Sequence, residues 1–355
     1  MVAAAELLQY LANGIGFGAI LALAAIGLSL VYGILNLSNF AHGDFVALGA
    51  FMTLLFATVH VTALPFLALG LGAAILLWLA LDVWRLKRLD KLERAIAGGF
   101  ATALLVLGAA MLATGERGPT TTELVLVTGT AVAIGAVVAI LLASEFLIWR
   151  PLRAKRATTL TLIIVSIGLS LVVRNALQVR FGGGNHNFSR PGIPSDRIFG
   201  ILVSDAQQFT IVTAIVAIVG VHLLLRYTRA GKAMRALADN AELARVTGID
   251  VDRMVIYVWI LSAALVTIAG VLLTLVQNNI MNVHMGFGII IALFASVIVG
   301  GIGSAYGAML GGFIVGIAMK TSASWIGTEY ELASAFMILI IVLIVRPQGI
   351  LGVKP

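Results

Sequence analysis

"GFGIIIALFASVIVGGIGSAYGAMLGGFIVGIAM" (residues 286–319) contains no charged residue. One helix of this length would extend about 50 Å at ~1.5 Å per residue, whereas the hydrocarbon core of a bilayer is ~30 Å thick. The segment must therefore fold back on itself. The glycine-rich break "GGIGSAYG" at 300–307 marks the turn, which predicts two membrane spans, 286–300 and 305–320.

The whole chain has a membrane-protein composition. Its 355 residues are 61% hydrophobic and 11% charged, with a mean hydropathy of +1.08. Soluble domains have about 45–50% apolar and about 25% charged residues. The apolar residues form long blocks without ten-residue alternation, which favours helices over barrel strands. We therefore expect an all-α polytopic membrane protein that forms one transmembrane domain, residues 1–355, and the absence of cysteine excludes disulfides.

Further apolar runs predict nine more spans, which gives about eleven in all. They are 13–35, 39–59, 61–81, 95–114, 124–148, 158–179, 208–225, 254–276 and 328–345. The amino-terminal "MVAAAELLQY" lacks the basic start and cleavage site of a secretory signal. The first span is therefore expected to remain in the mature protein.

The distribution of basic residues predicts the orientation. Most of the 23 Lys and Arg residues lie in the loops 85–94, 150–156 and 226–253 and in the tail from 346. An eleven-span path places all four regions on one side, and cytoplasmic loops collect basic residues. The amino terminus is therefore expected outside and the carboxy terminus in the cytoplasm. The same bias accounts for the net charge of +7, so that no nucleic-acid partner is expected.

A polar stretch, "RYTRAGKAMRALADNAELARVTGIDVDRM" (226–254), interrupts the apolar blocks. Small apolar residues recur there at helical spacing, which predicts a short amphipathic helix over 232–245 that ends at Gly248. The apolar positions are Met234, Leu237, Ala241 and Ala244. This narrow stripe suits a groove of another protein better than lipid. The spacing leaves two interpretations open, a solvated connector and a docking helix for a cytoplasmic partner.

Several motifs together resemble the permease subunits of the branched-chain amino acid ABC importers, specifically the first of their two permease types. The polar stretch is one of them. The others are "NGIGFGAILALAAIGLSLVYGILNLSNFAHGDF" (13–45), "WRPLRAKRATTLTLIIVSIGLSLVVRN" (149–175), "VGGIGSAYGAMLGGFIVGIA" (299–318) and "EYELASAFMILIIVLIVRPQGILG" (329–352).

The resemblance implies a permease subunit in the cell (inner) membrane that forms the pathway for branched-chain or other hydrophobic amino acids. It also implies four kinds of partner: membrane lipid, a second permease subunit that is homologous or identical, two cytoplasmic ATPases, and an extracytoplasmic substrate-binding protein. Close relatives of this family move urea or short amides, which stays open as an alternative substrate class.

By the same resemblance, residues 229–252 form the coupling segment through which an ATPase drives the permease. Importers usually carry Glu-Ala-Ala here, with a glycine four positions on. This chain has Glu242 followed by Leu and Ala, and its glycine lies six positions on. The residues expected to couple are Arg235, Asp239, Glu242, Arg245 and Gly248.

The chain is not expected to be an enzyme. A P-loop needs G-x-x-x-x-G-K-[ST], and the nearest approach, "AGKA" at 230–233, lacks the Ser or Thr. ATP hydrolysis is therefore expected on partner subunits. The acidic and His residues form no H-E-x-x-H and no paired ligand spacing, so that no cofactor or metal is expected.

Ionisable groups near the spans suggest a pathway, because such groups are costly in lipid. Asn39, His42 and Asp44 precede or begin the second span. They either cap this helix or form a bent entry that faces the translocation route. A stand-alone secondary transporter or channel, the alternative class, would need such groups at mid-span, but here they map toward the span ends.

Glycines suggest close helix packing near the carboxy terminus. Two series recur every four residues, which lets backbones approach closely. They are Gly303, Gly307 and Gly311, and Gly312 and Gly316. They serve either packing within one subunit or a subunit interface or gate.

Two further expectations concern loops. Segments 181–207 and 277–285 are the outer regions where a binding protein would dock. Between the second span and "WRPLR" the family usually has one span, whereas this chain has three candidates, so that 85–124 is expected to be an extra-hairpin insertion.

Overall fold

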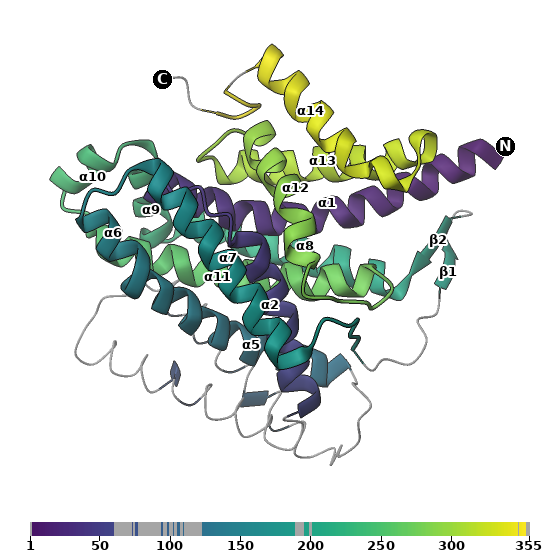
Figure 1. The fold of residues 1–355 in the computed structure, drawn as a ribbon, viewed down its shortest axis with the longest axis horizontal. Coiled ribbons are helices and arrows are strands. Elements are labelled where there is room, and N and C mark those ends of the chain that lie inside the picture. The colour runs from purple at the N-terminus through teal and green to yellow at the C-terminus, as the bar shows by residue number, and fades with distance from the viewer. Residues whose placement is uncertain are drawn as a thin grey trace.

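The protein is a helical bundle in the computed structural model (Figure 1). The structure describes residues 2–59, 123–188, 195–198, 201–346 and 348–352, and isolated positions between 73 and 109. The described elements are α1 (Val2–Leu35), α2 (His42–Leu54), the π-helical turn η1 (Leu55–Val59), α5 (Glu123–Ser144), the π-helical turn η3 (Glu145–Trp149), α6 (Arg150–Ala154), α7 (Thr159–Phe181), β1 (Ser195–Ile198), β2 (Ile201–Ser204), α8 (Asp205–Tyr227), α9 (Arg229–Asp239), α10 (Ala241–Val246), α11 (Val251–Val276), α12 (Met285–Gly300), α13 (Ala305–Ile326), the 3₁₀ turn η4 (Thr328–Tyr330) and α14 (Glu331–Val345).

The described helices follow the predicted spans. Seven are long and apolar enough to cross a membrane, and two shorter apolar ones, His42–Ala57 and Met285–Gly300, correspond to the predicted spans 39–59 and 286–300. The chain turns between α12 and α13 through Gly301 and Gly303, which both have positive φ. The predicted spans 61–81 and 95–114 and the insertion at 85–124 fall in the part of the chain described only at isolated positions. Helices thus dominate, and the described strands form one antiparallel pair, β1–β2.

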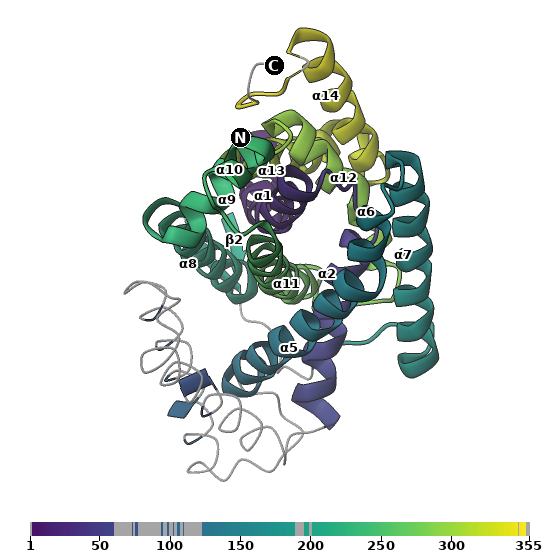
Figure 2. The ribbon, with the colours of Figure 1, turned by 90° about the vertical axis from the view of Figure 1, so that its left-hand side faces the viewer.

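Helix α1 lies at the centre of the bundle. Figure 2 looks along it and shows α8, α11, α12 and α13 around it. In its most apolar stretch of 18 residues, 89% of the residues are buried inside the protein. Apolar and small residues on all sides explain this, since a helix without a polar face has no side to turn to water.

The two ends of the bundle differ. One end, which we call the α9–α10 end, holds three of the four predicted basic regions. Arg150 pairs there with Asp252 at 3.1 Å. The tail lies at the same end, where Ile350 and Leu351 bond to the backbone of Val299 and Gly300. The fourth basic region, 85–94, lies outside the described ranges apart from single positions. The opposite, β1–β2 end holds the start of α1, where the Gln9 side chain bonds to the Leu202 backbone.

Candidate functional site

The polar stretch forms two helices and not one. Helix α9 ends at Asp239 and α10 begins at Ala241, with Asn240 between them in an extended conformation (φ −155, ψ 102). The Asn240 side chain accepts a hydrogen bond from Leu243 N at 2.9 Å and so caps α10. The predicted continuous helix over 232–245 is therefore wrong, because an Asn side chain competes for backbone donors and favours a helix start.

The apolar stripe of this segment packs inward. Met234, Leu237 and Ala244 are buried, and they belong to the main core of the protein. Gly33 of α1 approaches Ala238 on the same side. The expectation that the stripe fits a groove of another protein is therefore wrong, since this chain's own bundle covers it.

The outward face of α9 and α10 carries the predicted coupling residues. Arg235, Asp239, Glu242, Arg245 and Gly248 are all exposed. Two large apolar side chains join them, Leu243 at 60% exposure and Val246 at 81%. We call these seven residues the coupling surface.

Both ends of the α9–α10 unit are fixed by local bonds. At its start, Thr228 Oγ1 accepts from Gly231 N at 2.9 Å and donates to Leu224 O at 2.6 Å. At its end, Gly248 has φ +87, and Ile249 N bonds to Ala244 O while Gly248 N bonds to Arg245 O. These two bonds and the positive φ define a Schellman motif, in which a glycine ends the helix. The predicted helix end at Gly248 is therefore confirmed. The coupling surface is therefore held on short, well-terminated helices.

The candidate pathway residues Asn39, His42 and Asp44 are all buried, with exposures of 0%, 0% and 1%. None of them is the N-cap residue of α2, which is Ala41, and no side-chain capping bond forms there. Asn39 Oδ1 accepts from Ala41 N at 3.1 Å, and His42 Nε2 lies 2.9 Å from Ala24 O of α1. The capping interpretation therefore fails for this helix.

Asp44 has a partner that sequence analysis missed, Arg174 of α7. Arg174 Nε donates to Asp44 Oδ1 at 3.1 Å and Nη2 donates to Oδ2 at 3.0 Å, and Ser170 Oγ also donates to Oδ2. The Arg174 guanidinium lies 4.7 Å from the centre of the Phe287 ring on α12. The available signal was a lone arginine within a predicted span, because such a charge needs a partner in the membrane.

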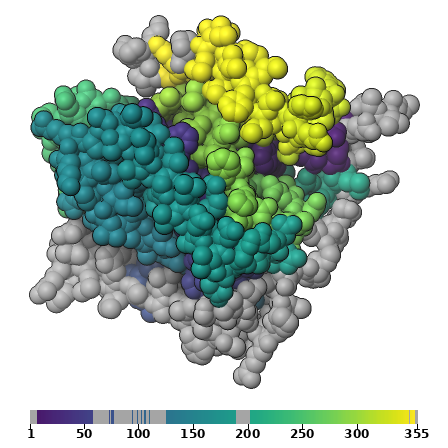
Figure 3. Space-filling view, viewed as in Figure 1, coloured from purple at the N-terminus to yellow at the C-terminus, as the bar shows by residue number. Residues whose placement is uncertain are grey.

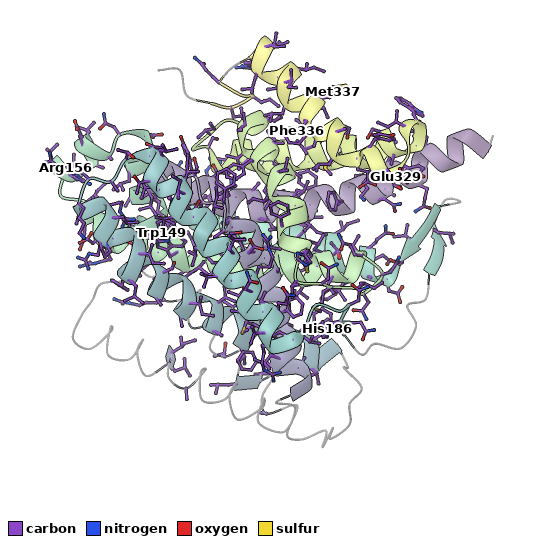
Figure 4. All side chains as sticks on the ribbon, in the orientation of Figure 1. Trp149, Arg156, His186, Glu329, Phe336 and Met337 are labelled. Carbon is purple, nitrogen blue, oxygen red and sulfur yellow. The ribbon has the colours of Figure 1, made fainter. Side chains whose placement is uncertain are left out.

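A second buried carboxylate lies nearer the α9–α10 end. Glu145 is 3% exposed, and it accepts hydrogen bonds from Trp259 Nε1 at 2.8 Å and from Arg153 Nη1 at 3.2 Å, as well as from Arg153 Nη2. It begins the π-helical turn that ends at Trp149, which Figure 4 labels. This group ties α5 and α6 to α11.

The two predicted docking loops meet at the β1–β2 end. His186 and Met281 form an antiparallel bridge with two 2.8 Å backbone bonds. Asn279 joins them by accepting from Phe188 N at 3.2 Å and donating to Phe188 O. Figure 4 labels His186 far from Trp149. Segments 181–207 and 277–285 thus share one surface through their described residues.

The glycines of the two series lie at contacts between helices of this chain. Those of the first series face different elements: Gly307 and Gly311 pack on Gly300 and Ser296 of α12, whereas Gly303 lies in the preceding turn beside Gly33. In the second series, Gly312 and Gly316 pack on Ala22 and Gly18 of α1. The two series therefore join α13 to two different helices.

Comparison with known proteins adds a family. A family model described as "Branched-chain amino acid transport system / permease component" matches residues 10–345. The chain is 29% identical to the high-affinity branched-chain amino acid transport system permease protein LivH of Escherichia coli K12, over 97% of this chain and 95% of the relative. It is 29% identical to the corresponding protein BraD of Pseudomonas aeruginosa, again over 97% and 95%. A probable branched-chain amino acid transport permease protein of Methanocaldococcus jannaschii is 30% identical over 97% and 92%. No solved structure matches the chain.

Proposed function

The chain belongs to the family of branched-chain amino acid transport system permease components, and from this membership we propose that it is the membrane-spanning permease subunit of an ABC importer. Its solutes are branched-chain or other hydrophobic amino acids, as the names of its relatives state for those proteins. It is a multi-pass protein of the cell membrane, with ATP hydrolysed on separate subunits.

The coupling surface carries this proposal. Charged and apolar side chains lie together there on two helices whose other faces are buried in the bundle. Exposed Leu243 and Val246 beside charges are typical of a protein contact. Because the inner stripe is anchored on the core, a push on this surface would move α8 and α11 with it. We propose that an ATPase binds here.

The orientation follows from the same surface. The basic regions at the α9–α10 end favour the cytoplasm by the positive-inside rule. The amino terminus and the docking loops at the β1–β2 end then face outward, where a substrate-binding protein would dock on segments 181–207 and 277–285. A second permease subunit completes the pore.

The pathway is proposed to run past the start of α2. Asn39, His42 and Asp44 lie in or beside an irregular segment between α1 and α2, and all three are buried in the bundle. Irregular backbone at membrane depth is tolerated where it is buried in protein or lines a water-filled cavity.

The test is reconstitution of the chain with its ATPases, second permease and binding protein. The double variant Leu243→Ser/Val246→Ser should lose ATP-driven leucine uptake and co-purification of the ATPases, because it removes the apolar part of the contact. Leu7→Ser/Leu8→Ser is the matched control, since Leu7 and Leu8 are 36% and 48% exposed at the opposite end and lie outside the docking segments. Normal uptake by the correctly inserted double variant would reject the coupling surface.

Two alternatives give different results in the same assay. A urea or short-amide permease would import those compounds and not leucine. A secondary transporter would show uphill uptake by this chain alone, driven by a proton or sodium gradient.

A further inference from the structure

Helices α2 and α12 begin at the same place and run in opposite directions. A Cβ on Gly43 would lie 2.3 Å from Gly286 O, and a Cβ on Gly286 would lie 2.3 Å from Gly43 O. The rings of Phe40 and Phe294 are 4.6 Å apart, so that α12 runs along the segment that precedes α2. Two helix amino ends therefore meet inside the bundle.

These two amino ends, like those of α6 and α14, lack the side-chain caps that six other described helices carry. Side chains cap α7, α8, α9, α10, α11 and α13, through Thr158, Ser204, Thr228, Asn240, Asp250 and Ser304. No side chain caps α2 or α12, although Gly43, Asp44, Met285 and Gly286 are buried. A buried helix start with free N–H groups favours an anion, and each start carries about half a positive charge.

Two donors around the start of α2 have no partner among the described residues. Asn39 Nδ2 is buried and has no hydrogen-bond partner, and the bond from Ala41 N to Asn39 Oδ1 holds this side chain in front of α2. Arg174 uses Nε and Nη2 on Asp44, while Nη1 bonds to none of the described residues. An amide before α2 and one guanidinium edge beside the first turns of α2 and α12 are therefore free.

The site opens to the surface next to an apolar wall. The Arg174 side chain is 13% exposed, and Phe287, which covers its guanidinium, is 58% exposed beside the exposed Gly288. On the face of the molecule seen in Figure 3, green segments lie between α14 in yellow and the blue-to-teal part of the chain that includes α7. An aliphatic side chain beside Phe287 and a carboxylate at Arg174 would match an apolar amino acid.

We propose that Arg174, Asn39 Nδ2 and the amino ends of α2 and α12 form a binding site for the carboxylate of the permeating solute. This inference rests on the proposed permease function and adds a defined station within its pathway. Asp44 acts as a positioning residue, because it holds the guanidinium by two bonds and leaves the third edge free.

The experiment uses the absence of native cysteine. Gly288→Cys introduces a thiol where a Cβ meets nothing within 4 Å, and Gly184→Cys, equally open in an exposed loop, is the control. Both are made in the importer assembled from its permease and ATPase subunits in phosphatidylcholine vesicles, without the binding protein. At each position we measure the ratio of two labelling rates, that of an anionic methanethiosulfonate reagent over that of its cationic trimethylammonium counterpart. This ratio should be roughly tenfold higher at residue 288 than at residue 184, because a positive site concentrates anions. L-leucine should slow labelling at 288, whereas L-leucinamide should not.

Arg174→Gln should abolish both the preference for the anionic reagent and the protection by leucine. The preference for the anionic reagent is also measured in the Gly288→Cys protein that keeps Arg174. Misfolding of the Arg174→Gln variant therefore does not decide the result. No reaction at 288, equal reagent ratios at the two positions, or equal protection by leucine and leucinamide would each overturn the carboxylate site. Labelling needs no ATP, so that it tests the carboxylate site independently of transport. A failure of ATP-driven uptake would contradict the proposed function and not the labelling result.

Discussion

The guanidinium of Arg174 and the carboxylate of Asp44 form a two-point ion pair, with contacts of 3.1 and 3.0 Å, between helices α7 and α2. Their side chains are 13% and 2% exposed. A pair this deep is stabilising only while both partners are present, because each charge alone would be desolvated without compensation.

Removal of one partner should therefore destabilise the protein strongly. We expect Arg174→Gln to cost about 3–5 kcal/mol of unfolding free energy, measured by thermal unfolding in detergent, and the double variant Asp44→Asn/Arg174→Gln to recover part of it. Arg150→Gln is the control, because Arg150 and Asp252 are 55% and 76% exposed and such pairs contribute at most about 1 kcal/mol. Equal losses in Arg174→Gln and Arg150→Gln would contradict this view.

Trp259 should stabilise the Glu145 group through its ring N–H. Trp259→Phe keeps most of the buried ring and removes the 2.8 Å bond to Glu145 Oε2. We expect a loss of about 1.5–3 kcal/mol, the range for hydrogen bonds to charged groups, in chemical or thermal unfolding. Trp325→Phe at an 81% exposed position should leave stability unchanged. A Trp259→Phe protein as stable as Trp325→Phe would show that the bond contributes nothing.

Gly316 should not tolerate a methyl group. Its Cβ would lie 2.3 Å from Gly18 Cα, so that Gly316→Ala must move α13 away from α1. Overpacking of this kind costs about 1–3 kcal/mol. Gly168→Ala, whose Cβ meets nothing within 4 Å, is the control and should be neutral or slightly stabilising. The measurement is the melting temperature of each variant, and an unchanged value for Gly316→Ala would refute the close packing.

Gly248 should hold the end of α10 through its backbone conformation alone. Its φ of +87 is unfavourable for a residue with a Cβ, and no atom lies within 4 Å of an added one. Gly248→Ala should cost about 1 kcal/mol and speed amide hydrogen exchange in α10. Gly248→Asn should be affected less, because Asn adopts this conformation more readily. Identical exchange in all three proteins would show that the φ angle is unimportant.

The elements of the fold were largely predictable. The spans followed from apolar runs near ~20 residues, and the turn in 300–307 followed from its glycines, because both depend on local sequence. The break at Asn240 was missed, since the helical spacing of Met234 and Leu237 continued through it. A single capping side chain outweighed that pattern.

The contents of the candidate site were less predictable. Asp44 and Arg174 are 130 residues apart in the chain, and nothing in either local sequence names the other as its partner. Phe287 lies still further along. Sequence analysis found Asn39, His42 and Asp44 by their polarity within apolar surroundings, but it assigned them a capping alternative that the structure does not contain.

The sequence by itself determined the class of the protein, the membrane-spanning helices that the structure describes and the end at which three of its basic regions gather. Helix formation and burial in a bilayer depend on residues close together in the chain and on their hydropathy, which can be counted directly. Only the tertiary structure decided that Gly43 meets Gly286, that Arg174 reaches Asp44, and that the stripe of α9 faces inward. Helices that are apolar on every side have no face marked for a particular neighbour, so that small residues and the matching of buried polar groups select the partners.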